Sequence, residues 1–190
     1  MVDVEGSAGS GFRPPYNEFG LLNLLSSHSG LSMMLMRIDR VVESEHPRLN
    51  GTLSHILAES VRDPDLLDGY DLTPSYDRYA RHLVHQGEGY SLLAIVWLPG
   101  QTSPIHSHRT WCALSVYRGW LNETLYGRSS ERIERVAERR LFRGDVSHSP
   151  PDLASAHRMT NLGTEAAVSI HIYGAAYDRL GQDVNHIWTI

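Results

Sequence analysis

The 190-residue chain contains a single cysteine, so it cannot form an internal disulfide bond. It lacks an apolar run long enough to cross a bilayer, and its first residues do not have the basic start and apolar core of a signal peptide. Its formal net charge is −5, and the arginines between residues 128 and 143 are interleaved with glutamates. We therefore expect a cytoplasmic protein with no membrane or nucleic-acid partner, as a monomer or small homo-oligomer.

The length suits one domain with a sizeable core, and the hydrophobic content of 41% is ordinary for a globular protein. Residues 1–15 are rich in glycine and serine and predict a flexible tail, so residues 16–190 are expected to form one domain. Helical spacing of apolar residues predicts a helical segment over residues 16–69, in which Met33, Met34 and Met36 are interpreted as core. From about residue 70 to 190, strands separated by glycines favour a β-barrel or sandwich.

Two of the predicted strands have informative patterns. Residues 90–98 are apolar almost throughout, which predicts that both faces of this strand are buried. Residues 168–173 alternate, so Ser169, His171 and Tyr173 share one face and three aliphatic residues share the other. By pattern alone, the polar face of this strand would be exposed to solvent.

The segment from Gly100 to Gly119 contains His106 and His108, two residues apart on a strand-like run. Alternate side chains of a strand point to one face, so both imidazoles can bind one metal ion rather than lie exposed on a strand rim. A third histidine would complete one face of an octahedron and leave the other open, which suits non-haem iron. His157 is favoured for this position because it enters a predicted strand, whereas His148 lies in a predicted loop.

The same segment resembles the cupin signature G-x5-H-x-H-x3-E-x6-G at every spacing, and His157 has the spacing of the second cupin motif. Cys112 stands where most cupins have a glutamate ligand. The resemblance implies a mainly β fold, a jelly-roll (cupin) barrel preceded by the N-terminal α-helices. Three neutral imidazoles would leave Fe(II) its full charge and favour an anionic ligand such as a thiolate.

From about residue 79 to residue 173, the chain is similar to the cysteine dioxygenase family, the thiol dioxygenase branch of the cupins, in its bacterial form. Residues 79–89, 119–126 and 157–161, together with the histidine pair, carry the resemblance. It implies an Fe(II) enzyme that oxidises L-cysteine with O2 to cysteine sulfinate. Arg81, helped by Tyr79, would bind the substrate carboxylate. The metal ligands that the resemblance implies are His106, His108 and His157.

The resemblance also turns the polar face of residues 168–173 into the site. Tyr173 would lie near iron and oxygen, while His171 and Ser169 form a hydrogen-bonded layer behind it, with Trp97 beside them. Cys112, counted back from the glycine of the signature, corresponds to the cysteine that forms a thioether with the active-site tyrosine in animal members. A thioether between Cys112 and Tyr173 is one expectation, and a small buried cysteine is the other.

Two features of the resemblance disagree about the substrate. The loop His-Ser-His-Arg-Thr-Trp is similar to that of bacterial mercaptopropionate dioxygenases, which usually have glutamine at the position of Arg81. We give Arg81 more weight, because a guanidinium makes a paired contact with a carboxylate that an amide cannot match. L-cysteine is therefore the expected substrate, and 3-mercaptopropionate or another small thiol is the alternative. A non-catalytic metal-binding cupin is a further alternative, and the missing glutamate disfavours a zinc or nickel isomerase or hydrolase.

Overall fold

A computed structural model describes residues 29–44, 49–129, 132–180 and 185–188 of the protein. The tail predicted over residues 1–15 lies outside these ranges, as does the first part of the predicted helical segment. Two α-helices, α2 (Ser29–Glu43) and α3 (Leu49–Ser60), precede the strands in the described chain. None of the described helices is long and apolar enough to cross a membrane.

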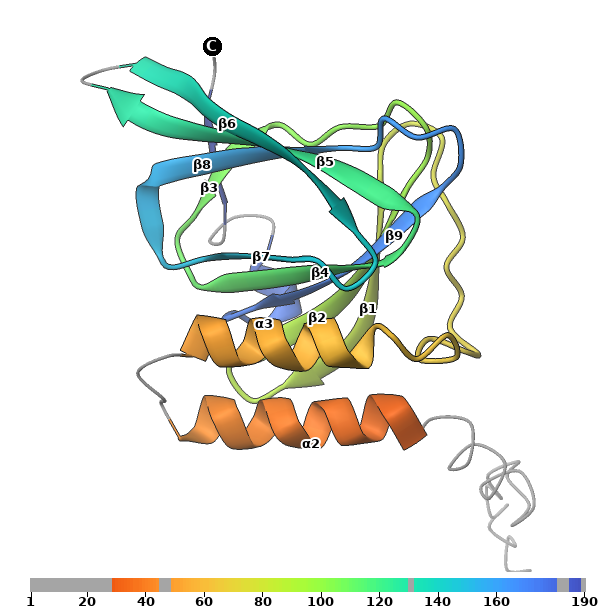
Figure 1. The fold of residues 1–190 in the computed structure, drawn as a ribbon. Coiled ribbons are helices and arrows are strands. Elements are labelled where there is room, and N and C mark those ends of the chain that lie inside the picture. The colour runs from red at the N-terminus through yellow and green to blue at the C-terminus, as the bar shows by residue number, and fades with distance from the viewer. Residues whose placement is uncertain (1–28, 45–48, 130–131, 181–184, 189–190) are drawn as a thin grey trace, which may run out of the picture.

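The described strands form two antiparallel sheets that face each other as a flattened barrel, with the helices beneath the first sheet (Figure 1). The first sheet has, in spatial order, β1 (Ala80–Gly87), β2 (Tyr90–Trp97), β9 (Ala167–Tyr173), β4 (Cys112–Arg118) and β7 (Val146–Ser149). The second has β10 (Asn185–Trp188), β3 (Ile105–His108), β8 (Asp152–Thr160), β5 (Trp120–Ser129) and β6 (Arg132–Phe142). A 3-10 turn, η1 (Tyr177–Arg179), follows β9. The predicted mainly β barrel with N-terminal helices is confirmed.

The helices are amphipathic, and they bury one stripe against each other and against the first sheet. Leu31, Met34 and Ile38 of α2 are buried in the same cluster as Leu53 of α3. The methionine cluster of α2 is not core as a whole, because Met34 is 1% exposed while its neighbours Met33 and Met36 are 64% and 66% exposed. Helical periodicity explains this difference, since consecutive residues of a helix point about 100° apart.

Strands β2 and β9 lie in the middle of the first sheet and are covered on both faces. Leu92, Ala94 and Val96 pack toward the helices, whereas the intervening residues of β2 belong to a second cluster inside the barrel. The prediction that residues 90–98 are buried on both faces is therefore confirmed for β2. The alternating pattern of β9 has the same cause, and its polar face is turned into the barrel rather than toward solvent.

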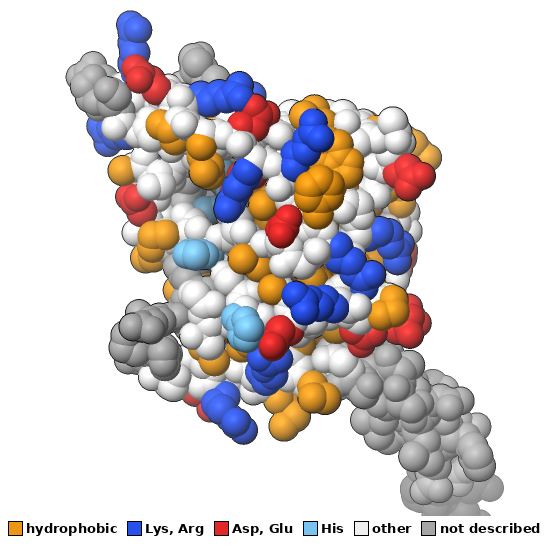
Figure 2. All heavy atoms as spheres, in the orientation of Figure 1, with side chains coloured by type: hydrophobic (Ala, Val, Ile, Leu, Met, Phe, Trp, Pro, Cys, Tyr) orange, Lys and Arg blue, Asp and Glu red, His pale blue; other side chains and the backbone are white. Residues whose placement is uncertain are grey.

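The tight connection between β4 and β5 requires glycine. Gly119 has φ +71°, and a Cβ at this position would lie 3.1 Å from Ala167. Residues with a side chain disfavour this backbone conformation, so the last glycine of the cupin signature maintains the turn between β4 and β5. On the face shown in Figure 2, basic and acidic side chains are interleaved, with apolar side chains between them.

Candidate metal centre

Three buried imidazoles meet inside the barrel. His106 and His108 lie on the four-residue strand β3, and their alternate positions turn both rings to the same side. Strand β8 pairs antiparallel with β3, and its His157 is the register partner of His106. The ligand nitrogens of the three residues lie within 4.8 Å of one another. A strand periodicity and a ladder register together therefore bring the three rings together.

The ring nitrogens have the spacing that a shared metal ion requires. The Nε2 atom of His157 lies 3.1 Å from Nε2 of His108 and 3.2 Å from Nε2 of His106. Metal–imidazole bonds of about 2.1 Å separate neighbouring nitrogens by about 3.0 Å on an octahedron and about 3.4 Å on a tetrahedron. Both separations from His157 fall in this interval, and all three ligand nitrogens lie within 4.8 Å of one another, so the cluster is suited to one shared ion.

Hydrogen bonds from Nδ1 fix which nitrogen is free to bind in His157 and in His106. Nδ1 of His157 donates to the carboxylate of Glu123 at 2.8 Å, and Nδ1 of His106 donates to the carbonyl of Pro104 at 3.1 Å. In the neutral rings the Nε2 atoms then carry lone pairs, which face each other at 3.2 Å. Such an arrangement is repulsive unless a cation lies between the lone pairs, so the donor set fits a metal ion.

Burial keeps two of these rings neutral. Loss of solvent, reinforced by the neighbouring His157, lowers the pKa of His106 from 6.5 to about 3. The same causes lower the pKa of His108 to about 2. Neutral imidazole is the form that binds metals, so protons do not compete for these nitrogens near neutral pH.

The structure brings His157 rather than His148 to the pair. His148 does not lie in a loop, because it belongs to strand β7 and pairs with Ala113 of β4. Its side chain is exposed, and it is not one of the three clustered ligand residues. The expectation of a loop failed because the serine and proline residues around His148 are typical of turns, and the pairing with β4 is a long-range contact.

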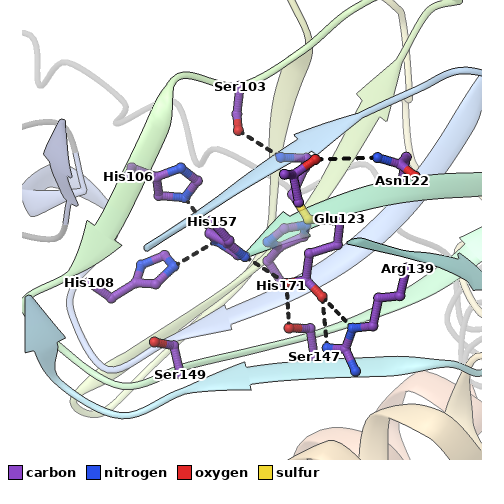
Figure 3. A network of polar contacts seen from close by, with 12 residues as sticks. Ser103, His106, His108, Asn122, Glu123, Arg139, Ser147, Ser149, His157 and His171 are labelled. Carbon is purple, nitrogen blue, oxygen red and sulfur yellow. Dashed lines mark hydrogen bonds and ion pairs between the residues drawn. The ribbon is translucent and has the colours of Figure 1, made fainter. Parts of the chain in front are cut away.

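Glu123 of β5 is a site residue that the sequence analysis missed. Its side chain is fully buried, and it accepts hydrogen bonds from His157 and, at 2.7 Å each, from Ser147 and Arg139 (Figure 3). Burial opposes ionisation, but the contacts with His157, Ser147 and Arg139 outweigh it and lower the pKa of Glu123 to about 2. A signal was available: Glu123 alternates with two leucines, Leu121 and Leu125, and so belongs to an inward-facing stripe.

A chain of hydrogen bonds runs along the inner face of β9. The indole of Trp97 donates to Oγ of Ser169 at 2.9 Å, Ser169 contacts Nε2 of His171 at 2.8 Å, and Nδ1 of His171 contacts the hydroxyl of Tyr173 at 3.1 Å. An indole can only donate, so the serine proton remains available for His171, whose Nδ1–H then donates to the tyrosine oxygen. Burial raises the pKa of Tyr173 well above its usual value, so the hydroxyl keeps its proton. The sequence analysis selected these four residues, and the structure joins them.

Cys112 lies directly beside Tyr173. The two residues are register partners between β4 and β9, and both belong to the buried cluster inside the barrel. Burial raises the pKa of the Cys112 thiol, which is fully enclosed. Both the thioether and the small buried residue expected from the sequence are compatible with this position.

Two pockets border the histidine cluster, and they differ in charge. One, of about 10 Å³, is lined by Arg81, Tyr79, Tyr173 and two of the ligand histidines, His106 and His157, among other residues. In it the Arg81 guanidinium donates to the Tyr79 hydroxyl at 3.0 Å, and the Tyr79 ring stacks on the indole of Trp97. The second pocket, of about 160 Å³, contains no arginine or lysine among its lining residues but does contain the Glu123 carboxylate. An anionic ligand is therefore favoured in the first pocket.

The β-barrel and its buried histidines define a metalloenzyme of the cupin type. Residues 69–182 match the family described as cysteine dioxygenase type I, and the chain belongs to this family.

Solved structures that resemble the chain include a protein of Thermus thermophilus, with 19% identity, 55% of this chain and 89% of that chain covered, and a TM-score of 0.43. An uncharacterized conserved protein of Klebsiella pneumoniae with a double-stranded β-helix domain has 18% identity, covers 62% and 90%, and has a TM-score of 0.42. A recombinant oxalate oxidase in complex with glycolate has 18% identity, covers 53% of each chain, and has a TM-score of 0.42.

Proposed function

We propose that this protein is a mononuclear non-haem Fe(II) thiol dioxygenase that oxidises L-cysteine with O2 to cysteine sulfinate. The observation that carries the proposal is that the histidine cluster borders a pocket containing Arg81, in a chain of the cysteine dioxygenase type I family. Ferrous iron bound by His106, His108 and His157 would supply a site at which a thiolate and dioxygen react. The reaction RSH + O2 → RSO2H places both oxygen atoms on sulfur and needs no separate reductant.

The protein's contribution is largely to hold the substrate. The guanidinium of Arg81 and the hydroxyl of Tyr79 can both donate to a carboxylate, and their mutual contact at 3.0 Å holds them together. A three-carbon thiol anchored at this end directs its sulfur toward the imidazoles that line the same pocket. Fixing the substrate in this way lowers the entropy cost of bringing sulfur and oxygen together.

Tyr173 donates a hydrogen bond to the reacting oxygen or sulfur atoms in this proposal. Its own oxygen accepts from His171, so its proton is free to point into the pocket that it lines. The chain of contacts through Ser169 to Trp97 holds the ring of His171 in the orientation that this requires. Substitution of any residue in this series of hydrogen bonds is expected to disorder the Tyr173 hydroxyl rather than the metal ligands.

Oxygen uptake by iron-loaded protein tests the proposal. Wild-type protein should bind about one iron per chain and consume O2 when cysteine is added, with sulfinate as product. His157→Ala should lose both iron and activity, whereas His148→Ala, a change of the same residue type at an exposed position of β7, should keep both. Full activity of His157→Ala, or loss of iron from His148→Ala, would contradict the ligand assignment.

A second candidate substrate is 3-mercaptopropionate, which lacks only the amine of cysteine. The loop between β3 and β4, with its Thr110-Trp111 pair, favours it through the resemblance to mercaptopropionate dioxygenases. That loop is anchored beside the site, since Thr110 donates to the carbonyl of Gly174 at 2.7 Å. Side-by-side oxygen uptake with the two thiols decides between them. A protein that holds metal but consumes no O2 with any thiol would instead be a non-catalytic metal-binding cupin.

A further inference from the structure

Glu123 is a buried carboxylate that has no part in the reaction proposed above. It lies in β5, where its register partners are Met159 of β8 and Arg139 of β6. Its side chain has no exposed surface. A carboxylate in such a place is costly unless its charge is matched by partners.

The two oxygens of Glu123 have different partners (Figure 3). Oε1 accepts from Nδ1 of His157 at 2.8 Å and from the hydroxyl of Ser147 at 2.7 Å. Oε2 accepts from Nε and Nη2 of Arg139, both at 2.7 Å. The Arg139 side chain is 47% exposed, so one carboxylate connects a buried imidazole of the metal cluster to a guanidinium at the surface.

We propose that Glu123 supplies, from behind His157, the negative charge that the three-histidine cluster lacks, and that Arg139 limits how much of that charge reaches the metal. The proposal rests on the metal binding assumed in the proposed function. Cys112 occupies the position where the cupin signature has a glutamate, so none of the three clustered ligands is anionic. Glu123 is an anion in hydrogen-bond contact with one of them, His157.

The two charges act on His157 with opposite sign. A carboxylate that accepts the Nδ1 proton makes Nε2 a stronger donor and fixes the orientation of the ring. The guanidinium of Arg139 draws the same carboxylate toward itself and also repels a dication. Loss of the Glu123 charge should therefore weaken metal binding, and loss of the Arg139 charge should strengthen it. If the ion pair served only to hold β5 against β6, both variants would break the same contact and shift metal binding in the same direction.

The experiment measures the dissociation constant of Fe(II) for the full chain without oxygen, by competition with a colour-forming chelator. Glu123→Gln should bind Fe(II) about 10- to 100-fold more weakly than wild type. Arg139→Gln should bind it about three- to tenfold more tightly. Arg140→Gln is the matched control, because it removes the same charge from the next residue of β6, whose guanidinium lies over the ring of Trp120. It should stay within about twofold of wild type.

The midpoint potential of the Fe(III)/Fe(II) couple gives a second readout, which should rise in Glu123→Gln and fall in Arg139→Gln. Shifts of both variants in the same direction would overturn the proposal. If Glu123→Gln does not fold, the half-exposed Arg139 decides alone, and unchanged or weaker Fe(II) binding by Arg139→Gln overturns the proposal. Wild-type protein that binds Fe(II) but oxidises no thiol would refute the proposed function and leave this inference standing. Same-direction shifts in a chain that oxidises thiols would refute this inference alone.

Discussion

The metal-free protein should be unusually sensitive to mild acid. Three imidazoles, those of His106, His108 and His171, have pKa values in the folded state far below the ordinary value of 6.5. Burial is the largest cause for each, and mutual repulsion adds to it. In the unfolded chain the same residues take up protons near pH 6.5. Below that pH the unfolded state therefore binds more protons than the folded state.

The sign and size of the effect follow from this difference. Stability from the neutral imidazoles is complete above about pH 6.5 and is lost as the pH falls toward their folded pKa values. At about pH 5.5, each unfolded imidazole is mostly protonated, which stabilises the unfolded state by about 1.4 kcal/mol per residue. His106 and His108, whose folded pKa values are about 3 and about 2, together give about 3 kcal/mol. This is a large part of the 5–15 kcal/mol that is typical of a folded domain, and His171 adds to the loss in the same direction. The pKa of Glu123 is lowered to about 2, so this carboxylate stays ionised throughout.

Chemical unfolding of chelator-treated protein at about pH 7.5 and about pH 5.5 measures this loss directly. We expect the unfolding free energy to drop by at least about 3 kcal/mol between the two conditions. His106→Gln should make the drop smaller by about 1.4 kcal/mol, because one titrating group is gone. Saturating metal at about pH 7.5 should raise the unfolding free energy through its binding to the folded state alone. A pH-independent free energy, or an equal drop in His106→Gln, would refute the reasoning.

Three further predictions test other parts of the structure. Arg81→Ala should raise the KM for cysteine at least about tenfold with unchanged iron content, because the carboxylate loses its partner; an unchanged KM in oxygen-uptake assays would exclude this role. Tyr90→Phe removes a 2.6 Å hydrogen bond to Asp39 and should lower the unfolding free energy by about 1–2 kcal/mol in urea, while an effect near zero would contradict it. Met34→Ala should cost about 2–5 kcal/mol, whereas Met36→Ala should stay within about 0.5 kcal/mol, and equal costs would show that α2 is packed differently.

Strand β9 shows where sequence reasoning reached its limit. Alternation in residues 168–173 correctly separates Ser169, His171 and Tyr173 from the aliphatic residues. The same alternation describes a strand with one face in water, which is the interpretation that pattern alone favoured. Only the packing of α2 and α3 on the aliphatic face leaves the barrel interior as the place for the polar face.

Glu123 and His148 are two further residues whose positions the sequence pattern did not reveal. Glu123 stands between inward-facing leucines, yet an acid at such a position is expected to be exposed unless its partners are known. Those partners, Ser147 and Arg139, come from β7 and β6. His148 was assigned to a loop from its serine and proline neighbours, although pairing with β4 makes it part of a strand.

The local spacing of His106 and His108 was enough to place two imidazoles on one face, because the two-residue period of a strand is a property of the backbone itself. The helical periodicity of α2 was predictable for a similar reason, because the period of a helix is also a property of the backbone. The position of His157 opposite His106, the carboxylate behind it and the arginine at the pocket depend on the register between strands distant in sequence. That register is set by how the whole barrel packs, so only the tertiary structure decided it.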